Sequence, residues 1–137
     1  MKTLVLDSWA ILEWISGRQP ASNFVGDLLA RAEAGETRLV MSAINVGEVY
    51  YFLRKNHGEE LSESWRQSSR TMPATLEVPT RDEIWDAALL KGCYPIAYAD
   101  AFAAALALKY RCPLVTGDPE FETVAAAGLV AIEWLPR

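Results

Sequence analysis

Residues 3–7 read Thr-Leu-Val-Leu-Asp, and this short stretch decides the fold class. Its first four residues form an apolar run of strand length, which Asp7 closes. Apolar runs at residues 39–41 and 114–116 are likewise followed by segments with turn or helix-capping residues. Strands that alternate with helices along the whole chain predict an α/β fold. We expect three layers, α/β/α, around a central parallel sheet of four to five strands.

The expected elements follow from periodicity and capping residues. We expect strands at residues 4–6, 38–41, 75–78, 114–116 and 129–133. We expect helices at about residues 8–16, 23–34, 43–55, 62–70, 81–92 and 99–110, with a short one between 119 and 127. Ser8 is a candidate cap for the first helix, and Thr80 with Glu83 forms a capping box. Asp118 followed by Pro119 is typical of a helix N-terminus.

Composition bounds the class of protein. The chain has 137 residues and 51% hydrophobic content, without a linker or repeat, so we expect one domain over 1–137. The apolar run at 101–108 is too short to span a membrane, and the N-terminal run is interrupted by Asp7, unlike a signal peptide. The two cysteines lack metal-type spacing, which indicates a cytoplasmic protein. His57 is the only histidine, which argues against histidine-based zinc sites and triads.

The net charge of −5 disfavours nucleic-acid binding at first sight. A metal that neutralised four carboxylates would leave a net charge of only about −1, which weakens that objection. Two basic pairs are candidates for an RNA-binding groove, namely Arg54 with Lys55 and Arg66 with Arg70. The simpler interpretation of these four residues is a solvated helix face.

Four carboxylates carry the chemistry: Asp7, Glu48, Asp100 and Asp118. Asp7 and Asp118 follow predicted strands, Glu48 lies about two turns into a predicted helix, and Asp100 lies at the start of another. If the strands are parallel, all four gather at their carboxyl ends, where open α/β sheets hold their sites. Four such groups cannot all stay ionised without a cation, so they predict a Mg²⁺ or Mn²⁺ site.

Each acid also has a simpler explanation. Asp7 and Asp118 could cap helices, Asp100 could favour the positive end of its helix dipole, and Glu48 could pair with Arg54 or Lys55 on the surface. Taken together these explanations are weaker. Glu48 lies in a largely apolar helix, where an isolated buried carboxylate is costly.

Four segments resemble the motifs of PIN-domain ribonucleases, and within that superfamily the VapC-type toxins of toxin–antitoxin pairs. They read VLDS at 5–8, NVGEV at 45–49, ADAFAAA at 99–105 and VTGDPEF at 115–121. The resemblance covers essentially the whole chain, in order and with suitable spacing. It implies that the four acids are catalytic and hold Mg²⁺ or Mn²⁺. Asp7 and Asp100 would be the most direct ligands, while Glu48 and Asp118 would act through water or complete a second metal.

Three polar residues are candidates for supporting the acids. Thr116 and Ser8 match positions whose hydroxyls often support such a cluster in the family. Asn45 lies about one turn before Glu48. For Ser8, helix capping is an equal alternative.

The resemblance implies an endoribonuclease toxin, a hydrolase that cuts RNA phosphodiesters by metal-activated water and leaves a 5′-phosphate and a 3′-hydroxyl. It implies two protein partners, a VapB-type antitoxin that covers a hydrophobic groove and places a basic side chain near the acids, and a second copy in a homodimer. No membrane partner is expected. The candidates for the groove or the dimer face are aromatic, with core packing as the alternative: Trp9, Trp14, Tyr51, Phe52, Trp65 and Trp85. We expect one or two tryptophans to be exposed.

Two other functions compete with this interpretation. One is a receiver-like signalling module that binds Mg²⁺ at its strand ends, but the paired acids and the late lysine of such modules are missing. The other is a PIN-like fold without nuclease activity that serves only protein binding. The presence of all four acids argues against the second function.

Overall fold

A computed structural model describes all 137 residues and places five strands in one parallel sheet. The strands are β1 (Lys2–Leu6), β2 (Thr37–Ser42), β3 (Thr75–Glu77), β4 (Leu114–Thr116) and β5 (Ile132–Trp134). The helices are α1 (Ser8–Ser16), α2 (Ala21–Glu33), α3 (Ala43–His57), α4 (Glu59–Ser68), α5 (Arg81–Cys93), α6 (Tyr98–Tyr110) and α7 (Glu122–Ala126), preceded by the one-turn η1 (Pro119–Phe121). The predicted three-layer α/β/α fold is therefore confirmed.

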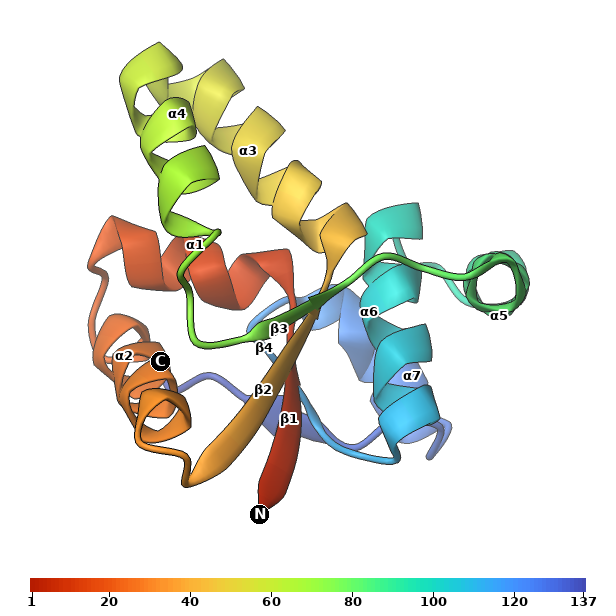
Figure 1. Cartoon of the computed structure of the whole chain (residues 1–137). Coiled ribbons are helices and arrows are strands. Elements are labelled where there is room, and N and C mark those ends of the chain that lie inside the picture. The colour runs from red at the N-terminus through yellow and green to blue at the C-terminus, as the bar shows by residue number, and fades with distance from the viewer.

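Helices cover both faces of the sheet (Figure 1). One core cluster joins α1, α2, α3 and α4 to the sheet, and the other joins α5, α6 and α7 to the opposite face. The side chains of β1 show the reason, because Val5 belongs to the second cluster whereas Leu4 and Leu6 belong to the first. Alternate residues of a strand point to opposite faces, so a central strand with both faces covered is apolar throughout.

The strand order is β3-β2-β1-β4-β5. A receiver-like domain has the order 2-1-3-4-5, so that alternative is wrong. The order reverses direction between β1 and β4, which pair through Val5 with Leu114 and Leu6 with Val115. Ligand sites of open α/β sheets lie outside the carboxyl ends of the strands at such a reversal. Here that position falls between Asp7, which follows β1, and Asp118, which comes two residues after β4.

Helix α6 lies at the centre of the second layer. Every residue from Asp100 to Ala107 is buried, and the helix contacts β1, β2, β4, α3 and α5. Five of these eight residues are alanine, and small side chains let a helix approach neighbours on all sides. The helix packs against α3, and the hydrogen bond from Asn45 Nδ2 to Ala99 O places the first turn of α6, with Asp100, beside the first turn of α3. None of the helices combines the length and the apolar character needed to cross a bilayer.

Several local predictions were wrong in detail. Asp7, not Ser8, caps α1, because its carboxylate accepts a hydrogen bond from Ala10 N–H at 2.8 Å. The capping box at Thr80 is half formed, since Thr80 accepts from Glu83 N–H while the Glu83 carboxylate binds Lys109. The fifth strand begins at residue 132, because residues 129–131 form the loop from α7. Helix α4 begins at residue 59, three residues before its predicted start, directly after the left-handed Gly58.

Candidate active site

A cavity of about 360 Å³ opens at the carboxyl ends of β1 and β4. Four carboxylates line it, those of Glu48, Asp100, Asp118 and Glu120. Its aromatic wall consists of Trp9, Tyr51 and Phe52. No lysine, arginine or histidine lines this cavity, so its negative charge has no cationic partner within the chain.

Asp7 lies beneath the cavity and is fully buried. One carboxylate oxygen accepts from Ala10 N–H, and the other accepts from the Thr116 hydroxyl. Thr116 Oγ1 in turn accepts from Asp118 N–H at 3.0 Å, so this hydroxyl connects the two acids that follow β1 and β4. Burial, together with the smaller effect of the charges of Asp118 and Glu48, raises the pKa of Asp7 to about 7, although the two hydrogen bonds lower it.

Asp100, Asp118 and Glu120 converge on one point. One carboxylate oxygen from each lies within 4.8 Å of the other two, a spacing that a single cation could bridge. Asp118 is positioned by capping η1, where its carboxylate accepts from Glu120 N–H at 2.9 Å. Glu120 is positioned by Ala97 N–H, which donates to its carboxylate at 3.2 Å from the loop before α6. Sequence reasoning missed Glu120, although it stands two residues after a predicted N-cap, in the first turn of the same short helix.

Glu48 reaches the cavity from α3 and is held by three side chains. Its carboxylate accepts a hydrogen bond from the Ser8 hydroxyl, and lies 3.5 Å from Asn45 Nδ2 and 3.4 Å from the Tyr51 hydroxyl. Asn45 Nδ2 also donates to Ala99 O at 3.1 Å, which ties α3 to the start of α6. The predicted supporting residues thus lie among the acids, Thr116 beside Asp7 and Asp118, and Ser8 and Asn45 beside Glu48.

The donor set fits a hard divalent cation. Burial, a hydrogen bond to Glu120 and the charges of the neighbouring acids hold the pKa of Asp100 well above its usual range. Asn45 Oδ1 is buried without a hydrogen-bond partner, so a further oxygen acceptor lies near Glu48. Carboxylate and amide oxygens are the ligands that Mg²⁺ and Mn²⁺ prefer, and such an ion would remove the repulsion among the acids.

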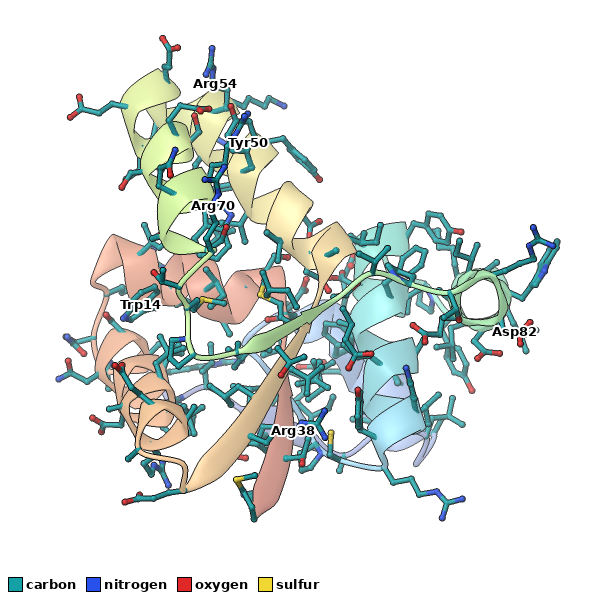
Figure 2. All side chains as sticks on the ribbon, viewed as in Figure 1. Trp14, Arg38, Tyr50, Arg54, Arg70 and Asp82 are labelled. Carbon is teal, nitrogen blue, oxygen red and sulfur yellow. The ribbon has the colours of Figure 1, made fainter.

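Three of the predicted basic residues lie on the α3–α4 pair, Arg70 lies in the turn after α4, and none of the four lines the cavity. Arg54 lies 3.9 Å from Glu59 and 4.0 Å from Glu63, and Figure 2 shows it near the end of the pair farthest from the sheet. Arg66 lies 3.5 Å from Glu63 and 4.9 Å from the centre of the Tyr50 ring. Lys55 and Arg70 are exposed. A role of these four residues in RNA binding stays a prediction.

The candidate aromatic residues divide into two groups. Trp65 is buried, and Trp14 packs against the same core cluster, so core packing explains both. The exposed members are Trp9, Tyr51, Phe52 and Trp85. With Trp134, which the sequence did not single out, three of the five tryptophans are exposed, one more than expected.

Comparison with known families decides the classification. A family model described as the PIN domain matches residues 4–127, which is most of the chain. This chain belongs to the PIN-domain family. The resemblance inferred from the four acidic motifs is thereby confirmed at the level of the family. No match was found among curated proteins.

Solved structures of toxin–antitoxin proteins share this PIN fold. VapBC2 from Rickettsia felis, bound to a DNA fragment from its promoter, has a TM-score of 0.71 at 15% identity, over 98% of this chain and 99% of that one. VapC20 from Mycobacterium tuberculosis, a sarcin–ricin-loop-cleaving toxin, has a TM-score of 0.70 at 16% identity, over 97% and 99%. A toxin–antitoxin complex from Klebsiella pneumoniae has a TM-score of 0.65 at 20% identity, over 88% and 92%. At these identities the likeness shows the fold alone.

Proposed function

We propose that residues 1–137 act as one PIN nuclease domain, a Mg²⁺- or Mn²⁺-dependent endoribonuclease that serves as the VapC-type toxin of a toxin–antitoxin pair. The convergence of Asp100, Asp118 and Glu120 at the strand reversal, above the buried Asp7, carries this proposal. The PIN-domain match and the fold shared with VapC20, a toxin that cleaves the sarcin–ricin loop, support it. RNA as the substrate places its action in the cytoplasm.

Each acid has a distinct part in this proposal. Asp100, Asp118 and Glu120 would hold the metal directly, and Glu48 would contribute from the facing helix. Asp7 would act from below, since its oxygens can accept more than the two hydrogen bonds they have. A divalent metal at this position supplies a more acidic water and neutralises negative charge on the phosphate and the leaving oxygen. The hydroxyls of Ser8 and Thr116 and the amide of Asn45 would orient the acids that hold this metal.

We also propose an antitoxin that covers the acidic cavity. Tyr51 and Phe52 are exposed on the cavity wall, and four carboxylates line it without a cation. A partner segment with apolar side chains and one arginine or lysine would complement both features. The shared fold with VapBC2 and with the Klebsiella pneumoniae toxin–antitoxin complex supports such a partner.

A homodimer through α5 is the third part of the proposal. Trp85 is 70% exposed and Leu89 is 67% exposed, one turn apart on the same face of α5. The opposite side of α5 buries Ala87 and Leu90 against the core, so this helix is apolar on two sides. A helix with a second apolar side usually packs against a second partner. Leu89→Asp should lower the apparent mass in sedimentation from that of a dimer to that of a monomer. The control is Leu61→Asp, on the exposed side of α4, which should leave the mass unchanged. Equal masses for the two variants would contradict the α5 interface.

The nuclease is tested on total RNA. Wild-type protein, Asp7→Asn and the exposed control Asp27→Asn are incubated with Mg²⁺, Mn²⁺ or EDTA, and the 5′ ends of the fragments are sequenced. We expect discrete cuts with 5′-phosphates that need metal and Asp7 but not Asp27. Absence of cleavage by wild-type protein in either metal, with Mg²⁺ binding retained in calorimetry, would instead support a PIN-like protein that only binds partners.

A further inference from the structure

A second cavity, of about 640 Å³, adjoins the acidic cavity. The two cavities share Trp9 and Pro119, which stand between them. The second cavity contains cationic side chains, which the acidic cavity lacks. Its walls include the guanidinium-bearing residues Arg18 and Arg137 and a second tryptophan, Trp134.

Trp9 is held in place by an unusual contact. It is the second residue of α1, and its indole lies against Gly117, between β4 and Asp118. A Cβ atom at Gly117 would lie 2.5 Å from Trp9 Nε1, so any larger residue there would displace the ring. Gly117 has no left-handed backbone, so the glycine is needed here for this close approach alone. The indole is therefore fixed next to Asp118 while it remains 39% exposed.

The opposite wall comes from the C-terminal segment. Trp134 is the last residue of β5 and is 41% exposed. Thr116 pairs with Trp134 across the sheet, which brings this tryptophan to the same strand ends as the acids. Two exposed indoles, each anchored by rigid structure, thus line one cavity.

The charges of this cavity suit a phosphate at its rim. The Arg18 side chain is 74% exposed and lies 3.5 Å from Glu13, which orients it without burying it. Glu13 and Glu122 also line the cavity, so it is balanced in charge, whereas the acidic cavity next to it has four carboxylates and no cation. An RNA strand that meets carboxylates at its scissile phosphate needs cations for a neighbouring phosphate, and Arg18 and Arg137 supply them.

We propose that this second cavity is a nucleotide subsite, in which the base of a residue flanking the scissile phosphate stacks on Trp9 and Trp134 and its phosphate binds Arg18. This inference rests on the proposed ribonuclease function, because it takes single-stranded RNA as the ligand. Stacking on aromatic side chains together with nearby cations is the usual way in which proteins hold single strands. The subsite fixes where the chain enters the acidic cavity, with Trp9 as the divider between the base and the site of cleavage.

The first test measures binding without cleavage. Fluorescein-labelled single-stranded RNA of random sequence, 12 nucleotides long, is titrated in EDTA and followed by anisotropy. Trp9→Ala and Trp134→Ala should each weaken binding about tenfold, and Phe at either position should retain most of it, since one stacked base contributes roughly 5- to 150-fold. The control is Leu61→Ala, because Leu61 is also an exposed apolar residue but lies on α4, outside both cavities and away from the proposed dimer face.

Arg18→Ala gives a second readout that does not depend on a tryptophan. It should lower the slope of log K against log salt by about 0.7, the contribution of one phosphate contact to a single strand. Arg81→Ala, exposed at the start of α5, should leave the slope unchanged. Mg²⁺ affinity should be the same in Arg18→Ala as in the wild type.

The second test uses an oligonucleotide that spans the cut mapped in total RNA. Each nucleotide near the cut is replaced in turn by an abasic residue. At one flanking position the replacement should raise KM about tenfold for wild-type protein and much less for Trp9→Ala, with kcat changed less than KM. Binding losses in Trp9→Ala and Trp134→Ala no larger than in Leu61→Ala would overturn the subsite and leave the nuclease standing. RNA binding that depends on both tryptophans, in a protein that never cuts, would refute the nuclease and retain the subsite.

Discussion

Replacing Asp7 with asparagine should make the metal-free protein more stable at pH 8, although it removes a carboxylate of the candidate site. Asp7 is fully buried, and burial raises its pKa from 3.8 to about 7. At pH 8 the folded chain therefore holds a buried charge that the unfolded chain holds in water. Asparagine keeps the shape, can still accept from Ala10 N–H, and presents an NH₂ group to the Thr116 oxygen.

The magnitude follows from linkage. A folded-state pKa of about 7 against 3.8 corresponds to about 4 kcal/mol of lost stability above pH 7. The sign is that of an acid whose pKa is raised by folding, so this stability is fully present below pH 3.8 and is lost as the pH rises through about 7. Loss of two charge-assisted hydrogen bonds offsets part of the gain, so we expect Asp7→Asn to add about 2–4 kcal/mol at pH 8. The advantage over wild type should shrink by roughly 2.5 kcal/mol at pH 5, where the folded wild type is protonated at Asp7.

The assay is urea unfolding followed by tryptophan fluorescence, at pH 5 and pH 8, with EDTA or with Mg²⁺. Asp27→Asn is the matched control, because Asp27 is exposed on α2 and the same chemical change there should have little effect. Mg²⁺ should stabilise the wild type more than Asp7→Asn, because binding to the folded state adds to its stability in proportion to the logarithm of affinity. At pH 8, added Mg²⁺ should therefore reduce the stability advantage of Asp7→Asn over the wild type.

Two results would refute this reasoning. If Asp7→Asn is less stable than wild type at pH 8 in EDTA, the buried carboxylate contributes more through its hydrogen bonds than it costs through desolvation. If the difference between the two proteins is the same at pH 5 and pH 8, the pKa of Asp7 in the folded state is not raised. Neither result depends on whether the protein cuts RNA.

Three further predictions concern the acids and the core. Glu120→Gln should weaken Mg²⁺ binding about tenfold in calorimetry. The control is Glu122→Gln, because Glu122 is exposed two residues further on, and it should bind Mg²⁺ as the wild type does. Equal Mg²⁺ affinities of the two variants would show that Glu120 is not part of the site. Because the pKa of Asp100 is raised, Mg²⁺ binding at pH 7 should release protons. The measured enthalpy of Mg²⁺ binding should therefore differ between two buffers with different ionisation enthalpies. Identical binding enthalpies in the two buffers would contradict this prediction. Ala104→Leu should lower the free energy of unfolding by about 1–3 kcal/mol, because α6 is buried on every side. The control is Ala30→Leu, which should have little effect because Ala30 is exposed on α2. Similar urea unfolding curves for the two variants would contradict the close packing of α6.

Local sequence predicted the elements well where side-chain chemistry acts on the nearest backbone. The strand at residues 114–116 and the helix start at Asp118 followed by Pro119 depend on contacts within a few residues, and both are confirmed. The capping box and the start of the fifth strand were predicted wrongly because a distant partner competed. Glu83 binds Lys109 of α6 instead of completing its capping box, and the start of β5 depends on its pairing with β4. Neither partner is visible from local spacing.

The sequence by itself determined the fold class and singled out four of the acids, because apolar periodicity specifies which faces are buried and because an isolated carboxylate in apolar surroundings is costly. Only the tertiary structure decided how those acids are arranged. The reversal of strand order between β1 and β4 brings Asp7 and Asp118 together through Thr116, although more than 100 residues separate them. It also adds Glu120 to the cluster and places Trp9 against Gly117, since both contacts depend on where a helix starts relative to a strand end. Such distances are set by the packing of the whole sheet, which no short stretch of sequence encodes.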